Sequence, residues 1–121
     1  MKQMEPIDLT QALKATDGDI ALLQEVLEAF FEEYPTLLRD LESALQTGDS
    51  AVVQRASHTI KGSLRLFGNV RSKELAERLE RMGAAGTLGD AMESYETLKQ
   101  ILASLESQLQ EAMKALVARY S

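Results

Sequence analysis

His58 is the single histidine of this 121-residue chain, and two residues that bear on its chemistry follow it within about one helical turn. Lys61 stands three positions later and Gly62 four positions later. A neutral imidazole nitrogen is a nucleophile at physiological pH, because the ordinary pKa of histidine is about 6.5. A nearby ammonium group stabilises the negative oxygens of a phosphoryl group. The spacing therefore predicts that His58 accepts a phosphoryl group and that Lys61 stabilises it.

Gly62 lies inside a stretch that otherwise has the composition of a helix. Glycine in a helix interior costs about 1 kcal/mol relative to alanine, so its presence beside the histidine calls for a reason. A missing side chain leaves room for another backbone or ligand to approach closely. We interpret Gly62 as a gap through which a partner protein reaches the imidazole.

The helical periodicity around His58 predicts which way the imidazole points. At about 100° per residue, the apolar residues of this helix lie opposite His58. The expected buried side comprises Val52, Val53, Ala56, Ile60, Ser63, Leu64 and Phe67. His58 is therefore expected to face solvent, on a surface that is small, polar or cationic. We predict that this surface docks the partner through Gln54, Arg55, Gly62, Arg65 and the border residue Leu66.

Other uses of His58 fit the sequence less well. The chain has no cysteine and no second histidine for a metal site, and no clustered carboxylate spacing. A hydrolytic triad needs a nucleophile and an acidic residue around the base. A glycine-rich phosphate loop and paired magnesium carboxylates are also missing from the sequence. We expect a phosphotransfer module that is not itself an enzyme and has no cofactor, metal or nucleotide site of its own.

The elements that must position His58 are expected to be helices, because apolar residues recur at intervals of three and four. We expect a short first helix capped by Asp8, and a second helix over about 20–45 that Pro35 kinks or splits. Further helices are expected over about 50–67, capped by Asp49, then from a cap at Asn69 to about 82, and from a cap at Asp90 to about 120, with a loop at 83–86. Short connections predict an all-α, antiparallel up-down four-helix bundle with a short additional N-terminal helix.

The length of the chain favours one domain over residues 1–121, large enough to form its own core. No apolar run approaches the roughly 20 residues of a membrane span, no signal peptide is visible, and cysteine is absent. We therefore expect a cytoplasmic protein without membrane contact. Because the two longest apolar seams are similar in length, they are expected to pack on each other within a monomer.

The net charge of the chain and its distribution indicate which kind of partner it binds. The net charge of −6 disfavours nucleic acid, whose phosphate backbone requires a basic face. Residues 51–82 hold seven basic and three acidic residues, a local net charge of +4 that leaves −10 for the remainder. The histidine thus lies in the basic part of an acidic chain, where a basic surface would attract an acidic partner.

The run His58-Thr59-Ile60-Lys61-Gly62-Ser63, followed by Phe67-Gly68, resembles the signature of histidine-containing phosphotransfer (HPt) domains of two-component phosphorelays. The upstream pattern is similar as well, at Ile7-Asp8-Leu9, Asp17-Gly18-Asp19, Leu22-Leu23, Phe30, Pro35, Leu37, Leu41 and Gly48-Asp49.

This resemblance implies a role for each residue of the motif. His58 would be the phosphoacceptor, Lys61 the phosphate-stabilising lysine and Gly62 the small residue that clears the docking surface. The implied partners are response-regulator receiver domains, one of which donates the phosphoryl group from an aspartate while another accepts it. A hybrid sensor histidine kinase is a further implied partner, and magnesium is expected on the receiver.

The chain departs from the family pattern at two positions. Leu64 stands where serine is common, and Leu66 stands where asparagine is frequent. Leu64 is expected to face the core without consequence, whereas Leu66 borders the docking surface and bears on which receiver is accepted. Two alternatives stay open: a non-catalytic helical adaptor that binds a receiver or regulator, and the substrate domain of a larger histidine kinase.

Overall fold

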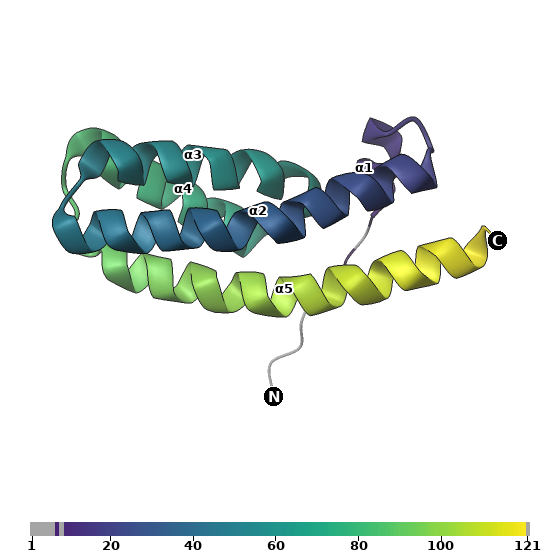
Figure 1. Ribbon diagram of the computed structural model, residues 1–121. Helices are drawn as coiled ribbons and strands as arrows, with labels where there is room; N and C mark the ends of the chain where they lie inside the picture. Colours follow the sequence, from purple (N-terminus) through teal and green to yellow (C-terminus); the bar gives the residue numbers. More distant parts are fainter. Residues whose placement is uncertain (1–6, 8, 121) are drawn as a thin grey trace.

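The structure, a computed structural model, describes residue 7 and residues 9–120, and this part of the chain forms five helices and no strand (Figure 1). The helices are α1 (Thr10–Ala15), α2 (Ile20–Thr47), α3 (Ser50–Phe67), α4 (Val70–Ala85) and α5 (Ala91–Arg119). The predicted all-α bundle with a short additional N-terminal helix is confirmed.

The two longest helices, α2 and α5, form the long axis of the molecule, and α3 and α4 cover only one half of it (Figure 1). The α3–α4 pair is a hairpin, and these two helices pack more extensively on each other than any other pair. The short α1 folds back at the opposite end, beside the start of α2 (Figure 1). The hairpin therefore carries the histidine and supplies its closest neighbouring helix.

Side-chain caps fix where three of the helices begin. Asp19, Asp49 and Asn69 each accept a hydrogen bond from the backbone N–H three residues later, over 3.0, 3.2 and 2.8 Å. Such bonds satisfy one of the backbone donors that a helix start leaves unpaired. The caps predicted at Asp49 and Asn69 are confirmed. Asp8, the cap predicted for the first helix, lies outside the described residues, and α1 begins at Thr10 without a side-chain cap.

The core is a continuous apolar seam between the helices. The seam of α2 comprises Leu23, Leu27, Phe30, Tyr34, Leu38, Leu41 and Ala44, and that of α5 comprises Tyr95, Leu98, Leu102, Leu105, Leu109 and Met113. The buried Tyr34 donates a hydrogen bond to Glu106 of α5, which gives its hydroxyl a partner within this seam. The ring of Phe30 lies 5.5 Å from that of Phe67 and so joins α2 to the C-terminal end of α3.

Two local predictions are wrong, and one of two alternatives at Pro35 is excluded. Residues 83–85 continue α4 and are not a loop; the chain turns at Gly86, whose φ of 72° is in the left-handed region that glycine adopts without strain. Of the kink or split expected at Pro35, the split does not occur: α2 continues through this residue, with buried side chains on both sides of it. Asp90 precedes α5 but makes no side-chain cap.

None of the described helices combines the length and the apolar character that crossing a bilayer requires.

Candidate functional site

α3 presents His58 to solvent, as the periodicity predicted. The imidazole side chain is 65% exposed. On the same helix Val53, Ile60 and Leu64 have no exposed surface, so they hold α3 against the core. Three residues depart from the prediction: Val52 and Ser63, expected on the buried side, are only half-buried, and Ser57, directly before His58, is fully buried. The buried side of α3 thus extends up to the histidine itself.

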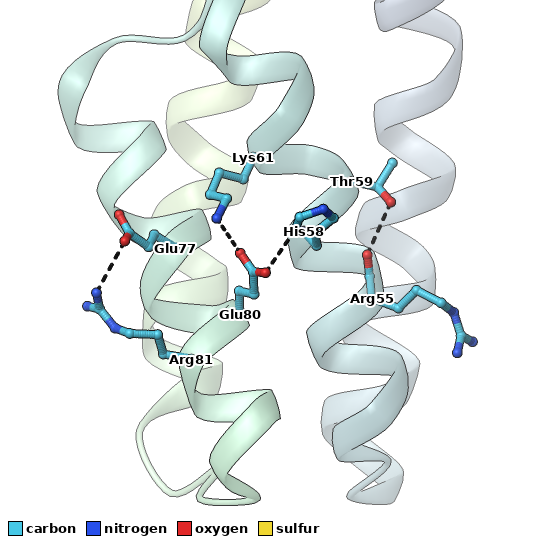
Figure 2. A network of polar contacts seen from close by, with 7 residues as sticks. All are labelled: Arg55, His58, Thr59, Lys61, Glu77, Glu80 and Arg81. Carbon is cyan, nitrogen blue, oxygen red and sulfur yellow. Dashed lines mark hydrogen bonds and ion pairs between the residues drawn. The ribbon is translucent and has the colours of Figure 1, made fainter.

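Glu80 of α4 joins the two site residues of α3 (Figure 2). Its Oε2 atom lies 2.8 Å from Nδ1 of His58, and its Oε1 atom lies 2.6 Å from Nζ of Lys61. The carboxylate and the ammonium are largely covered, with 19% and 21% of their side-chain surfaces exposed. The imidazole and the ammonium therefore share one carboxylate at the junction of the two helices.

This arrangement determines which ring nitrogen of His58 is free. A carboxylate accepts hydrogen bonds, so the contact requires a proton on Nδ1. A neutral imidazole carries one ring proton, which leaves Nε2 with an unshared electron pair. The site thus holds a nucleophilic nitrogen on an exposed ring whose other nitrogen is fixed by an acidic side chain.

The charge of Glu80 is maintained by its partners. The contact with the Lys61 ammonium is the main cause that lowers the pKa of Glu80 from its ordinary value of 4.5. Partial burial of the carboxyl group acts in the opposite direction, and the hydrogen bond with His58 lowers the pKa further. Glu80 is consequently a carboxylate at neutral pH, able to stabilise a positive charge on the ring.

Gly62 is open, as expected: a Cβ added to it would meet no heavy atom within 4 Å. It lies on the rim of a groove of about 390 Å³ between α2 and α3. Most of its lining is apolar, with Glu33, Thr59 and Ser63 as the polar members; the apolar part comprises Val26, Ala29, Phe30, Leu66 and Phe67. The half-buried Leu66 forms part of its wall. An apolar hollow therefore adjoins the surface that carries the imidazole.

The remaining predicted docking residues surround the imidazole without joining the carboxylate. Gln54, Arg55 and Arg65 are exposed. The side chain of Arg55 extends away from the group formed by His58, Lys61 and Glu80 (Figure 2). Within residues 7 and 9–120 no three potential ligand side chains gather as a metal site.

Glu80 is the site residue that the sequence analysis missed. It stands 22 residues after His58 and belongs to no motif around it. One signal was available: an antiparallel hairpin that turns at Gly68 and Asn69 pairs residues at equal distances from the turn. His58 and Glu80 lie at nearly equal distances on the two sides, so the predicted hairpin already brought them level.

Both the sequence and the fold are similar to those of known proteins. The family model described as "Hpt domain" matches residues 25–118 of the chain. Among solved structures, the fold is similar to that of histidine-containing phosphotransfer protein B (HptB) from Pseudomonas aeruginosa PAO1, with a TM-score of 0.80. The two chains are 21% identical, and the similarity covers 93% of this chain and 98% of the other. None of the curated proteins compared with the sequence matches it significantly.

Proposed function

Because the chain belongs to the Hpt domain family, which serves histidine phosphotransfer in phosphorelays, we propose that His58 accepts a phosphoryl group from a receiver-domain aspartate and passes it to another receiver. One observation carries this assignment to His58. Its ring is 65% exposed, while its Nδ1 atom is held by Glu80 and its Nε2 atom is left as the nucleophile.

Phosphoryl transfer from the receiver to His58 needs no reactant other than these two proteins. The electron pair of Nε2 attacks the phosphorus atom of the aspartyl phosphate, and the bond between phosphorus and the aspartate oxygen breaks. The electron pair of that bond returns to the aspartate, which leaves as a carboxylate. The phosphorylated ring is then a cation that still carries its proton on Nδ1. The same steps in reverse deliver the phosphoryl group to the second receiver.

Glu80 and Lys61 stabilise different charges in this reaction. The Glu80 carboxylate, 2.8 Å from Nδ1, faces the positive charge that develops on the ring. The Lys61 ammonium is anchored 2.6 Å from the same carboxylate, so it stays close to the imidazole. Its flexible stem allows the ammonium to contact a phosphoryl oxygen while it remains near Glu80. In this proposal the ion pair holds Lys61 ready beside the nucleophile.

The receiver is proposed to dock over Gly62 and the adjoining groove. The open space above Gly62 admits a partner loop, and the apolar wall that includes Leu66 offers burial for a partner side chain. Arg55 and Arg65, exposed on the same helix, favour the acidic surface around a phosphorylated aspartate. Gln54 lies at the N-terminal side of this surface. The receiver would bring the magnesium ion that its own aspartyl phosphate requires.

The experiment that tests this function is labelling with a phosphorylated receiver. The chain should become labelled when it is incubated with a cognate receiver that carries radioactive phosphate, and His58→Gln should abolish the label. Circular dichroism of His58→Gln would establish that the variant is folded, as expected for an exposed position. A folded His58→Gln variant that still became labelled would overturn the assignment. Unimpaired signalling by that variant would instead favour a non-catalytic adaptor.

A further inference from the structure

At Gly83, α4 lies directly against the backbone of α3. This glycine is buried, and a Cβ added to it would lie 2.5 Å from the backbone nitrogen of Gln54 and 2.9 Å from the carbonyl oxygen of Ser50. Both atoms belong to the backbone, so no side-chain rotation could relieve the overlap. The two helices therefore touch backbone to backbone here, and only glycine permits the observed separation.

This contact lies one helical turn from the catalytic group. Gly83 follows Glu80 by three residues on α4, and Gln54 precedes His58 by four residues on α3. Residues at these spacings share one face of a helix. The backbone contact and the Glu80–His58 hydrogen bond are thus neighbouring contacts between α3 and α4. The distance between the helices at Gly83 therefore sets their distance at Glu80.

The distances show how sensitive this coupling is. To move the added carbon from 2.5 Å to an ordinary contact of 3.4 Å, the helices must separate by about 0.9 Å. The same displacement at Glu80 would lengthen its 2.8 Å contact with Nδ1 to about 3.7 Å, beyond the range of a hydrogen bond. Lys61 has a longer and more flexible side chain, so its ammonium can follow the carboxylate.

We propose that Gly83 is a positioning residue for phosphoryl transfer: by letting α4 touch the backbone of α3, it holds the Glu80 carboxylate within hydrogen-bonding distance of His58 Nδ1. Gly83 acts through Glu80 and touches neither the phosphoryl group nor the imidazole. The consequence for transfer rests on the proposed function of His58, whereas the consequence for the ring tautomer does not.

The test is the tautomer of His58 in Gly83→Ala. Because the chain has one histidine, the nitrogen NMR spectrum of labelled imidazole reports this ring alone. When its ring is neutral, the unsubstituted protein should carry the ring proton on Nδ1. Gly83→Ala should move the proton population towards Nε2 and slow phosphoryl transfer from a receiver by about 10-fold or more, since a misplacement of about 1 Å can cost about 100-fold.

Matched variants separate positioning from general packing. Gly89→Ala makes the same chemical change at a glycine whose added Cβ meets no heavy atom within 4 Å, and it should leave both tautomer and transfer unchanged. Glu80→Asp withdraws the carboxylate without touching the helix contact and should reproduce the tautomer change. If Gly83→Ala does not fold, Ala76→Val enlarges a fully buried residue on the same face of α4, one turn on the other side of Glu80, and takes its place.

The NMR result and the transfer result have separate meanings. A folded Gly83→Ala or Ala76→Val variant whose ring keeps its proton on Nδ1 would overturn the positioning role, whatever its transfer rate. A changed tautomer without any labelling of the unsubstituted protein would uphold the helix coupling and count against the proposed function instead.

Discussion

Nδ1 of His58 on α3 and Oε2 of Glu80 on α4 lie 2.8 Å apart, although 22 residues of chain separate them. This contact joins the exposed imidazole to a largely covered carboxylate that also holds Lys61. The candidate site is therefore distributed over two helices, which share charge through one carboxylate.

Removal of the Glu80 charge should slow transfer. In Glu80→Gln the amide oxygen can still accept the Nδ1 proton, but the negative charge opposite the phosphorylated ring is lost. We expect the single-turnover rate from a phosphorylated receiver to fall by about 10-fold, and Glu80→Ala to lower it further because the hydrogen bond is lost as well.

The control for Glu80 is Glu77→Gln, one turn earlier on the same helix. Glu77 is half exposed and pairs with Arg81 over 3.4 Å, away from His58. The Glu77→Gln variant should accept the phosphoryl group at the same rate as the unsubstituted protein. Equal rates for Glu80→Gln and Glu77→Gln would show that the carboxylate beside the ring has no part in the reaction.

Acid should weaken the fold partly through Glu80. The folded protein, chiefly through Lys61, lowers the pKa of Glu80 below its ordinary value of 4.5. A group whose pKa is lower in the folded state binds protons more weakly there, so its stabilisation is present above the ordinary pKa and is lost as the pH falls through the folded value. Thermal unfolding of Glu80→Gln should therefore approach that of the unsubstituted protein at low pH.

The measurement is the difference in Tm between the two proteins as a function of pH. It should be constant near neutral pH and decrease below about pH 4.5. The Glu77→Gln control carries no such prediction, because its ion pair is solvent exposed. A Tm difference that grew as the pH fell would contradict the stated role of Glu80.

Loss of the Lys61 ammonium should impair transfer more than docking. We expect Lys61→Ala to lower the transfer rate by about 10-fold or more, because a cation that faces the transferring phosphoryl oxygens is lost. Lys61→Arg keeps the charge and should recover part of the rate. Receiver affinity, measured by calorimetry, should change much less. The matched control is Lys114→Ala on α5. The Lys114 side chain is 77% exposed and pairs with Glu111. A transfer rate for Lys61→Ala equal to that of Lys114→Ala would show that the Lys61 ammonium has no part in the mechanism.

Substitutions of Gly62 should leave the fold stable but, where the new side chain is long, weaken receiver docking. Because an added Cβ meets nothing within 4 Å, Gly62→Ala should stabilise the helix by up to about 1 kcal/mol. Gly62→Gln should also fold stably, yet its longer side chain should occupy the approach to the imidazole and weaken receiver binding. Thermal unfolding and receiver titration measure the two effects separately. Undiminished affinity in Gly62→Gln would exclude this surface as the docking site.

The sequence by itself determined what lies within one helix. The 3.6-residue period placed His58 opposite Val53, Ile60 and Leu64, and the fixed rise of a helix placed Lys61 and Gly62 beside it. These relations need only local hydrogen bonds and the burial of one apolar face. The caps at Asp49 and Asn69 were predictable for the same reason, since a cap joins residues three positions apart.

The tertiary structure decided what depends on two helices at once. Residues 83–85, small and glycine-containing, have the composition of a loop, yet they remain helical because Gly83 packs directly on the backbone of α3. Ser57 became buried although its place on the helical wheel lies outside the apolar side. Glu80 contacts His58 because the register of α4 against α3 sets its carboxylate level with the imidazole. No local rule fixes that register; it follows from how closely two particular surfaces can approach.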